Sequence, residues 1–150
     1  MKAVLLIALI LFSAVTAYER LWAKGDVLLG ELQNGRDELH VAFFYDSTNT
    51  EEVYAKVREN DRVRKEVMTY LDTISEGGDK PFPVPVFLSI VDAVDPYNNN
   101  IIFKSGFNTT ALDDGPVVLA LRHQTGYVQS GAKVEAALRD SVEKLREVTP

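Results

Sequence analysis

The stretch Leu39-His40-Val41-Ala42-Phe43-Phe44-Tyr45 decides the fold of this chain. It is apolar or aromatic at every position except His40, and it is the length of a β-strand. Such a run suits a strand buried on both faces, as at the centre of a sheet covered by helices on each side. Polar residues begin at Asp46, so we expect the strand to end at Tyr45. The stretch predicts an α/β domain built around a central sheet.

Helix and strand patterns alternate along the rest of the chain. Asp26 has a side chain suited to capping the first helix, and Asn60-Asp61 predicts a break within the second, longer helix. Pro116 opens the third strand. The expected helices span 27–32, 53–74, 101–107 and 134–145, and the expected strands span 39–45, 86–91, 117–121 and 127–129.

The order and spacing of these elements resemble the thioredoxin family. Residues 39–45 resemble the strand that leads to the family's active site, and Lys104-Ser105-Gly106-Phe107 resembles its Lys-Tyr-Gly-Val type motif. Gly115-Pro116-Val117-Val118-Leu119 resembles its segment with a cis-proline before a strand, and 126–131 resembles its closing hairpin. The resemblance covers nearly all of the chain after residue 17. It implies a thioredoxin-like fold, a mixed β-sheet flanked by helices, with a cis peptide bond before Pro116.

The chain contains no cysteine. Thiol–disulfide exchange needs a thiolate, so this sequence excludes the redox chemistry of the family it resembles. Where that family places Cys-x-x-Cys, this chain has Asn49-Thr50-Glu51-Glu52. It is similar in this respect to the non-catalytic domains of protein disulfide isomerases, which bind unfolded or partner chains. We expect a protein that is not an enzyme, with no catalytic and no cofactor-binding residues.

The other titratable residues do not indicate a catalytic or metal site. Glu51 and Glu52 suit the first turn of a helix, where negative charge is favourable, and with Asp46 they lack the regular ligand spacing of a calcium loop. His40 and His123 without any cysteine make neither a structural zinc site nor a nucleophile pair. We expect both histidines to be structural, and no cofactor or metal.

The N-terminus reads as a secretory leader. Lys2 precedes an unbroken run of apolar and small residues that ends at Ala17, as in a signal peptide. We expect a signal peptide at 1–17, with a retained membrane anchor as the alternative, and a single domain at 18–150. Asn108 begins the acceptor sequon Asn-Thr-Thr and is a glycosylation candidate. These features predict the secretory pathway, either the ER lumen or secretion; a retained anchor would place the domain on the non-cytosolic side of a membrane.

The formal net charge of −6 disfavours nucleic acid as a partner, and a membrane is expected only if the leader is retained. The favoured hypothesis is a protein-binding domain that captures an extended peptide. The alternative is a structural subunit of a larger membrane or extracellular assembly, anchored by its leader. The candidate partner-binding residues are Asp46, Ser47, Thr48, Asn49, Thr50, Gly115 and Pro116.

Overall fold

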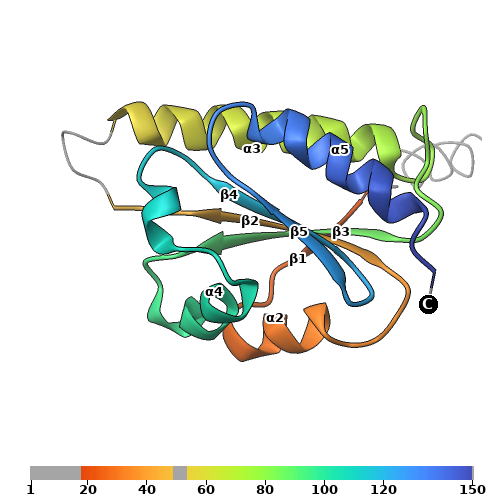
Figure 1. Cartoon of the computed structure of the whole chain (residues 1–150), viewed down its shortest axis with the longest axis horizontal. Helices are drawn as coiled ribbons and strands as arrows, with labels where there is room; N and C mark the ends of the chain where they lie inside the picture. Colours follow the sequence, from red (N-terminus) through yellow and green to blue (C-terminus); the bar gives the residue numbers. More distant parts are fainter. Residues whose placement is uncertain (1–17, 49–53, 150) are drawn as a thin grey trace, which may run out of the picture.

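The computed structural model describes residues 18–48 and 54–149. Figure 1 shows a central sheet with helices on both of its faces. No helix of this described part is long and apolar enough to cross a membrane. The elements in chain order are β1 (Glu19–Leu21), α2 (Gly25–Leu32), β2 (Leu39–Tyr45), α3 (Tyr54–Ile74), β3 (Val86–Asp92), η2 (Pro96–Asn98), α4 (Asn99–Ser105), η3 (Thr109–Leu112), β4 (Val117–Arg122), β5 (Thr125–Gln129) and α5 (Val134–Arg146).

The five strands form one mixed sheet in the order β1-β3-β2-β4-β5. β3 pairs in parallel with both β1 and β2, whereas β4 runs antiparallel to β2 and to β5. β2 therefore occupies the centre, and six of its seven residues are buried. This confirms the prediction of a central strand over 39–45, because a strand covered on both faces needs a continuous apolar run.

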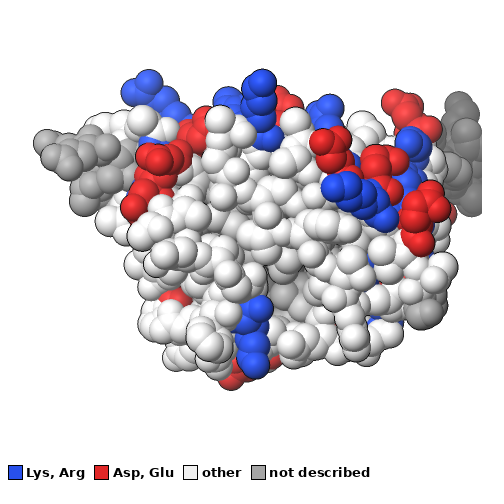
Figure 2. Space-filling model, viewed as in Figure 1, with Lys and Arg blue, Asp and Glu red and all other residues white. Residues whose placement is uncertain are grey.

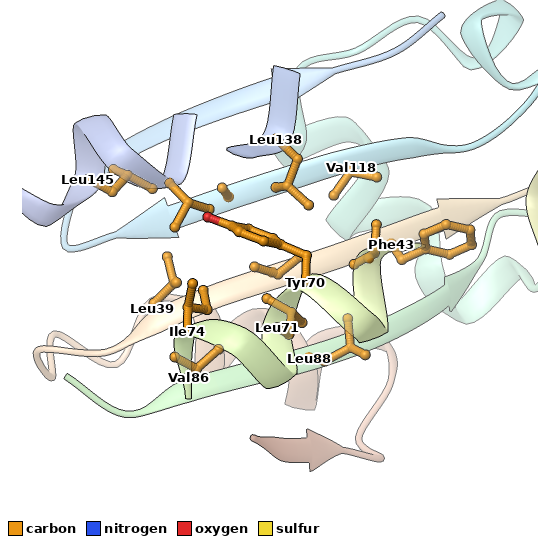
Figure 3. Close-up of a cluster of buried hydrophobic side chains, with 14 of the residues drawn as sticks. Leu39, Phe43, Tyr70, Leu71, Ile74, Val86, Leu88, Val118, Leu138 and Leu145 are labelled. Carbon is orange, nitrogen blue, oxygen red and sulfur yellow. The ribbon is translucent and has the colours of Figure 1, made fainter. Parts of the chain in front are cut away.

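Alternate residues of β2 face two separate hydrophobic clusters. Leu39, Val41 and Phe43 pack with buried residues of α3 and α5 on one face of the sheet. Figure 3 shows part of this cluster, in which side chains from the two helices meet those of the strands. Ala42 and Phe44 face the other side, where α2 and α4 cover the sheet. The sheet thus lies between two helical layers (Figure 1).

Two details of the helices differ from the sequence prediction. The expected break at Asn60-Asp61 is absent, because α3 runs without interruption from Tyr54 to Ile74. Asn60 is buried on the inner face of α3, and Asp61 forms an ion pair with Arg64 one turn later, so both residues fit a continuous helix. Lys24 rather than Asp26 holds the N-cap position of α2, and Asp26 lies within its first turn.

The expected cis bond before Pro116 is wrong. The described residues contain no cis peptide bond, so Gly115–Pro116 is trans. The trans isomer is the lower in free energy for an ordinary X-Pro bond. The connection between α4 and β4, which includes η3, reaches the start of β4 with this bond trans. β1 is a further difference, since no strand was predicted at Glu19–Leu21.

Candidate functional site

The register of β2 and β4 brings the predicted partner-binding residues to one end of the sheet. Phe44 pairs with Val117 at the end of the antiparallel ladder. Continued by two residues, this register sets Asp46 opposite Gly115. Ser47 and Thr48 follow Asp46 and are exposed. Asn49 and Thr50, with Glu51 and Glu52, lie outside the described residues.

Gly115 and Pro116 are buried at this end, whereas Ser47 and Thr48 face solvent. Gly115 packs against α3, because a Cβ built on it would lie 3.1 Å from Cγ of Glu59. The backbone of Gly115–Pro116 is therefore covered in this structure. Exposed side chains at the same end of the sheet are the groups available to a partner.

Asp46 is held by a partly buried ion pair. Its Oδ2 lies 2.9 Å from Nζ of Lys56, whose side chain is only 9% exposed, and its Oδ1 accepts a hydrogen bond from the Thr48 amide at 2.8 Å. Burial alone would raise the pKa of Asp46, but the hydrogen bonds from Thr48 and Lys56 outweigh it and lower the pKa to about 2. Lys56 shares the inner face of α3 with Asn60 and Val63, and this helical spacing is the signal in the sequence from which its burial could have been predicted.

This ion pair predicts an acid-dependent loss of stability. The folded-state pKa of Asp46 lies below its ordinary value, so its contribution is complete above about pH 4 and is lost as the pH falls toward 2. We expect Asp46→Asn to lower the free energy of unfolding by about 1–2 kcal/mol at pH 7 and the gap to wild type to narrow below about pH 4. Urea unfolding at several pH values measures this gap. Asp61→Asn, on the exposed side of α3, is the control, and a gap for Asp46→Asn that does not change with pH would contradict the assignment.

A pocket of about 280 Å³ opens beside Asp46, between α3 and the ends of β2 and β3. Asn60 is buried there, and its Oδ1 has no hydrogen-bond partner among the described residues. Neither Gly115 nor Pro116 lines this pocket. The lining residues are Phe43, Tyr45, Asp46, Ser47, Val57, Asn60, Asp61, Arg64 and Ile90.

Exposed apolar side chains gather at the same end of the molecule. We call the end of the sheet where β2 and β3 finish the carboxyl end; β1 stops three residues short of it, with Leu21 paired to Ser89 (Figure 1). Of the eight large apolar side chains that are exposed among the described residues, five lie in the segments that follow β1 and β3 or in the first turn of α3. They are Trp22, Tyr54, Val57, Val94 and Tyr97.

The segment that carries Tyr97 is fixed by buried hydrogen bonds. Asn98 is 3% exposed; its Nδ2 donates to the Asp92 carbonyl at 2.9 Å and its Oδ1 accepts from the Gly25 amide at 2.9 Å. Gly25 has φ +62°, and a Cβ there would come within 2.9 Å of the Tyr97 carbonyl oxygen, so only glycine fits without a shift. These contacts tie the loop after β3 to the start of α2.

The rings of Trp22 and Tyr97 are each covered on one side by a cation. The Arg20 guanidinium lies 4.3 Å from the centre of the Trp22 ring, and Nζ of Lys24 lies 5.3 Å from that of Tyr97. Lys24 also pairs with Asp95 at 3.1 Å. Such contacts limit the rotation of the rings while leaving Trp22 80% and Tyr97 73% exposed. The aromatic side chains are therefore partly preorganised for contact.

Both histidines lie away from the carboxyl end and make structural contacts. His40 stacks on Phe87 and its Nε2 lies 2.9 Å from Oε2 of Glu38. Nε2 of His123 lies 2.9 Å from Oδ1 of Asp37. Within residues 18–48 and 54–149, no three histidine or acidic side chains are grouped to hold a metal ion.

The glycosylation candidate Asn108 lies in an exposed loop before η3. Its Oδ1 accepts a hydrogen bond from the Thr110 amide at 3.0 Å, which makes Asn108 the N-cap of this short helix. Thr110, the third residue of the sequon, is also exposed. The acceptor sequence is thus sterically open to modification.

Comparison with known proteins gives matches among solved structures. No protein-family model and no curated protein sequence matches the chain. A redox protein from Chlamydomonas reinhardtii superposes on 91% of this chain with a TM-score of 0.58 at 16% identity, and the chain spans 38% of that protein. A mutant thioredoxin from Halobacterium salinarum NRC-1 gives a TM-score of 0.56 at 17% identity, over 90% of this chain and 99% of that one.

A third match is the first thioredoxin domain of mouse protein disulfide-isomerase A4. It has a TM-score of 0.50 at 14% identity, and the match covers 87% of this chain and 78% of that one. Structural matches at identities this low establish the fold, but not the activity or the site residues. The absence of cysteine is compatible with a domain that lacks redox activity. The chain has a thioredoxin-like fold, as the sequence predicted.

Proposed function

We propose that this protein is a non-catalytic thioredoxin-like domain that binds another protein through the carboxyl end of its sheet. The observation that carries the proposal is the concentration of exposed apolar side chains there, of which Trp22 and Tyr97 are the two most exposed. Single exposed apolar residues are normal on a soluble protein. A group of them at one edge is typical of an interaction surface.

The chemistry of this surface suits a polypeptide partner. Tryptophan and tyrosine are enriched at the centres of protein interfaces, where they bury a large apolar area and keep one polar atom for a hydrogen bond. The exposed turn of Ser47 and Thr48 lies at the same end and offers polar contacts at the rim. We expect an extended segment of the partner to place apolar side chains against Trp22 and Tyr97.

The surface is built to keep its shape before a partner arrives. Asn98 and Gly25 hold the Tyr97 loop against α2, and Arg20 restrains Trp22. Side chains that are already ordered lose less conformational entropy when they bind. This preorganisation supports binding as the role of the carboxyl end, where the thioredoxin family has its redox site.

The experiment compares the tagged full chain with a Trp22→Ala/Tyr97→Ala variant. Each is expressed in the source cells and isolated under gentle conditions, and quantitative mass spectrometry measures the amount of every protein that is isolated with it. We expect one or more proteins at stoichiometric ratio with wild type and a loss of more than about tenfold with the double variant, because interface aromatic residues contribute about 2 kcal/mol or more each. Phe103→Ala, which removes a ring 81% exposed on α4, is the matched control.

Two results of this isolation would contradict the proposal. One is a chain that travels alone under gentle conditions. The other is a companion protein that the double variant and the Phe103→Ala control release to the same extent. Circular dichroism of each variant verifies that the fold is retained, so that a loss of partner reports on the surface.

The intact mass of the same isolated chain tests the compartment. We infer that the domain works in the secretory pathway, because the sequence begins with a signal-like segment and Asn108 is exposed in its sequon. The expected mass is that of a chain starting at Tyr18, with a glycan that an N-glycosidase removes. A chain that retains Met1 and Lys2 would favour the alternative of an anchored assembly subunit.

A further inference from the structure

A second, larger cavity lies away from the carboxyl end of the sheet. It has a volume of about 910 Å³ and lies between the C-terminal half of α2, the end of α4 and the β4–β5 hairpin. Figure 2 shows a hollow between the hairpin and the α2–α4 layer, with few charged residues around it, whereas charged residues gather along the side where α3 and α5 lie. The volume lies within the range of small-molecule sites, about 300–1,000 Å³.

The cavity has an apolar floor. Leu119 and Leu121 of β4 and Val128 of β5 line it from the sheet, and Leu29 and Leu32 of α2 line it from the helical layer. The α2–α4 layer leaves this half of the sheet partly open, because Val128 is still 42% exposed. A ligand with an apolar body would cover these side chains and remove their surface from water.

Gly126 leaves room for the leucines on the floor of the cavity. It pairs with Leu121 across the β4–β5 ladder and lines the cavity. A Cβ built on it would lie 3.2 Å from Cδ1 of Leu121 and 3.5 Å from Cδ1 of Leu119. A larger side chain at this position would therefore press on the two leucines and disturb the apolar floor.

The charge of the cavity wall is opposite to that of the whole chain. Its charged lining residues are Arg36, Lys104 and Glu38, two cations and one carboxylate, whereas the chain carries a net charge of −6. Arg36 is already paired with Glu38 at 3.2 Å and with Glu31 at 2.8 Å. Lys104, exposed in the last turn of α4, forms no ion pair within the part of the chain that the structure describes. The wall thus offers one free cation.

The same wall contains a buried polar atom without a partner. The His40 side chain is 5% exposed and forms part of the wall, and its Nδ1 has no hydrogen-bond partner among the described residues. Burial lowers the pKa of His40, so the ring is neutral at pH 7. Its proton lies on Nε2, which donates to Glu38, and Nδ1 is left as a hydrogen-bond acceptor. A buried acceptor gains free energy when a donor is supplied to it.

We propose that this cavity binds a small apolar carboxylate that carries one hydrogen-bond donor. The apolar body would lie on Leu119, Leu121 and Val128, and the carboxylate would pair with Lys104. Nδ1 of His40 is covered in this structure, so the donor, an amide N–H or a hydroxyl, would satisfy it after a shift of the side chains over it. This site is independent of the protein-binding surface at the carboxyl end and goes beyond the function proposed for that surface.

The test is isothermal titration of the full chain with N-octanoylglycine, which combines an acyl chain, an amide N–H and a carboxylate. Gly126→Val should weaken binding at least about tenfold by crowding the leucines of the cavity floor, and Lys104→Gln should weaken it about fivefold by removing the cation. The matched controls are Gly30→Ala, which has open space around its Cβ position on α2, and Lys65→Gln on α3. Neither control residue lines the cavity, so both variants should bind as wild type does.

Two altered probes test the groups on the ligand. The methyl ester of N-octanoylglycine lacks the charge and should bind wild type about fivefold more weakly, with no further loss in Lys104→Gln. N-octanoylsarcosine lacks the N–H and should also bind about fivefold more weakly, because Nδ1 of His40 then has no donor. The proposal is overturned if N-octanoylglycine shows no saturable binding, if Gly126→Val binds it as wild type does, or if both altered probes bind as tightly as the parent.

Discussion

Replacing Phe44 with alanine is expected to lower the free energy of unfolding by about 4 kcal/mol, a large part of the 5–15 kcal/mol typical of a domain. Phe44 is fully buried in the central strand, and its ring lies edge-to-face with that of Phe107 at 5.0 Å. It lies between Val91 of β3 and Val117 of β4 in the sheet. The strands on both sides are held by backbone pairing, so the cavity left by the ring cannot collapse.

Urea unfolding followed by circular dichroism measures this loss. Phe103→Ala removes the same ring from α4, where it is 81% exposed, and should change the free energy of unfolding by no more than about 0.5 kcal/mol. Equal losses for Phe44→Ala and Phe103→Ala would show that Phe44 is not part of a packed core. The pair therefore tests the placement of the α2–α4 layer on the sheet.

The parts of the fold that sequence predicted are those with a dense apolar pattern. Residues 39–45 were predicted because burial on two faces requires a continuous apolar run, and residues 134–145 because burial along one helical face leaves a helical period. β1 is only three residues long, and it forms a strand because it pairs with β3. The local sequence contains no pattern that predicts this pairing. The predicted break at Asn60-Asp61 is wrong, because the polar side chain of Asn60 is buried within a continuous helix.

The candidate site was predictable only in its location. An antiparallel pair of strands brings the residues after one strand to those before the other, and the register of β2 and β4, continued by two residues, sets Asp46 opposite Gly115. Their local sequence did not indicate that Gly115 and Pro116 are buried. Trp22 and Tyr97 follow two different strands, and their shared location at the carboxyl end depends on the parallel pairing of β1 with β3.

Replacing Arg122 with methionine is the second large expected effect, a loss of about 3–5 kcal/mol. Arg122 is 6% exposed at the end of β4, and its Nε and Nη2 donate to the two carboxylate oxygens of Asp37 at 2.8 and 3.2 Å. Its Nη1 donates to the carbonyls of Leu145 and Arg146 at 2.9 and 3.1 Å. Methionine fills a similar volume but leaves these acceptors at the end of α5 without a donor.

The pH dependence of this loss separates the ion pair from simple packing. The hydrogen bond from Arg122 lowers the pKa of Asp37, so the stabilisation is present at neutral pH and is lost as the pH falls through the folded-state pKa of Asp37. The gap between wild type and Arg122→Met should therefore narrow in acid. It should not close, because the carbonyls of α5 do not titrate.

Arg64→Met is the comparison that shows what burial adds. Arg64 pairs with Asp61 at 3.2 Å on the exposed side of α3, and its loss should cost no more than about 1 kcal/mol. Denaturant unfolding of both variants at pH 7 gives the two values. If Arg122→Met were as mild as Arg64→Met, the guanidinium would not join β4 to the end of α5, and packing alone would hold α5 on the sheet.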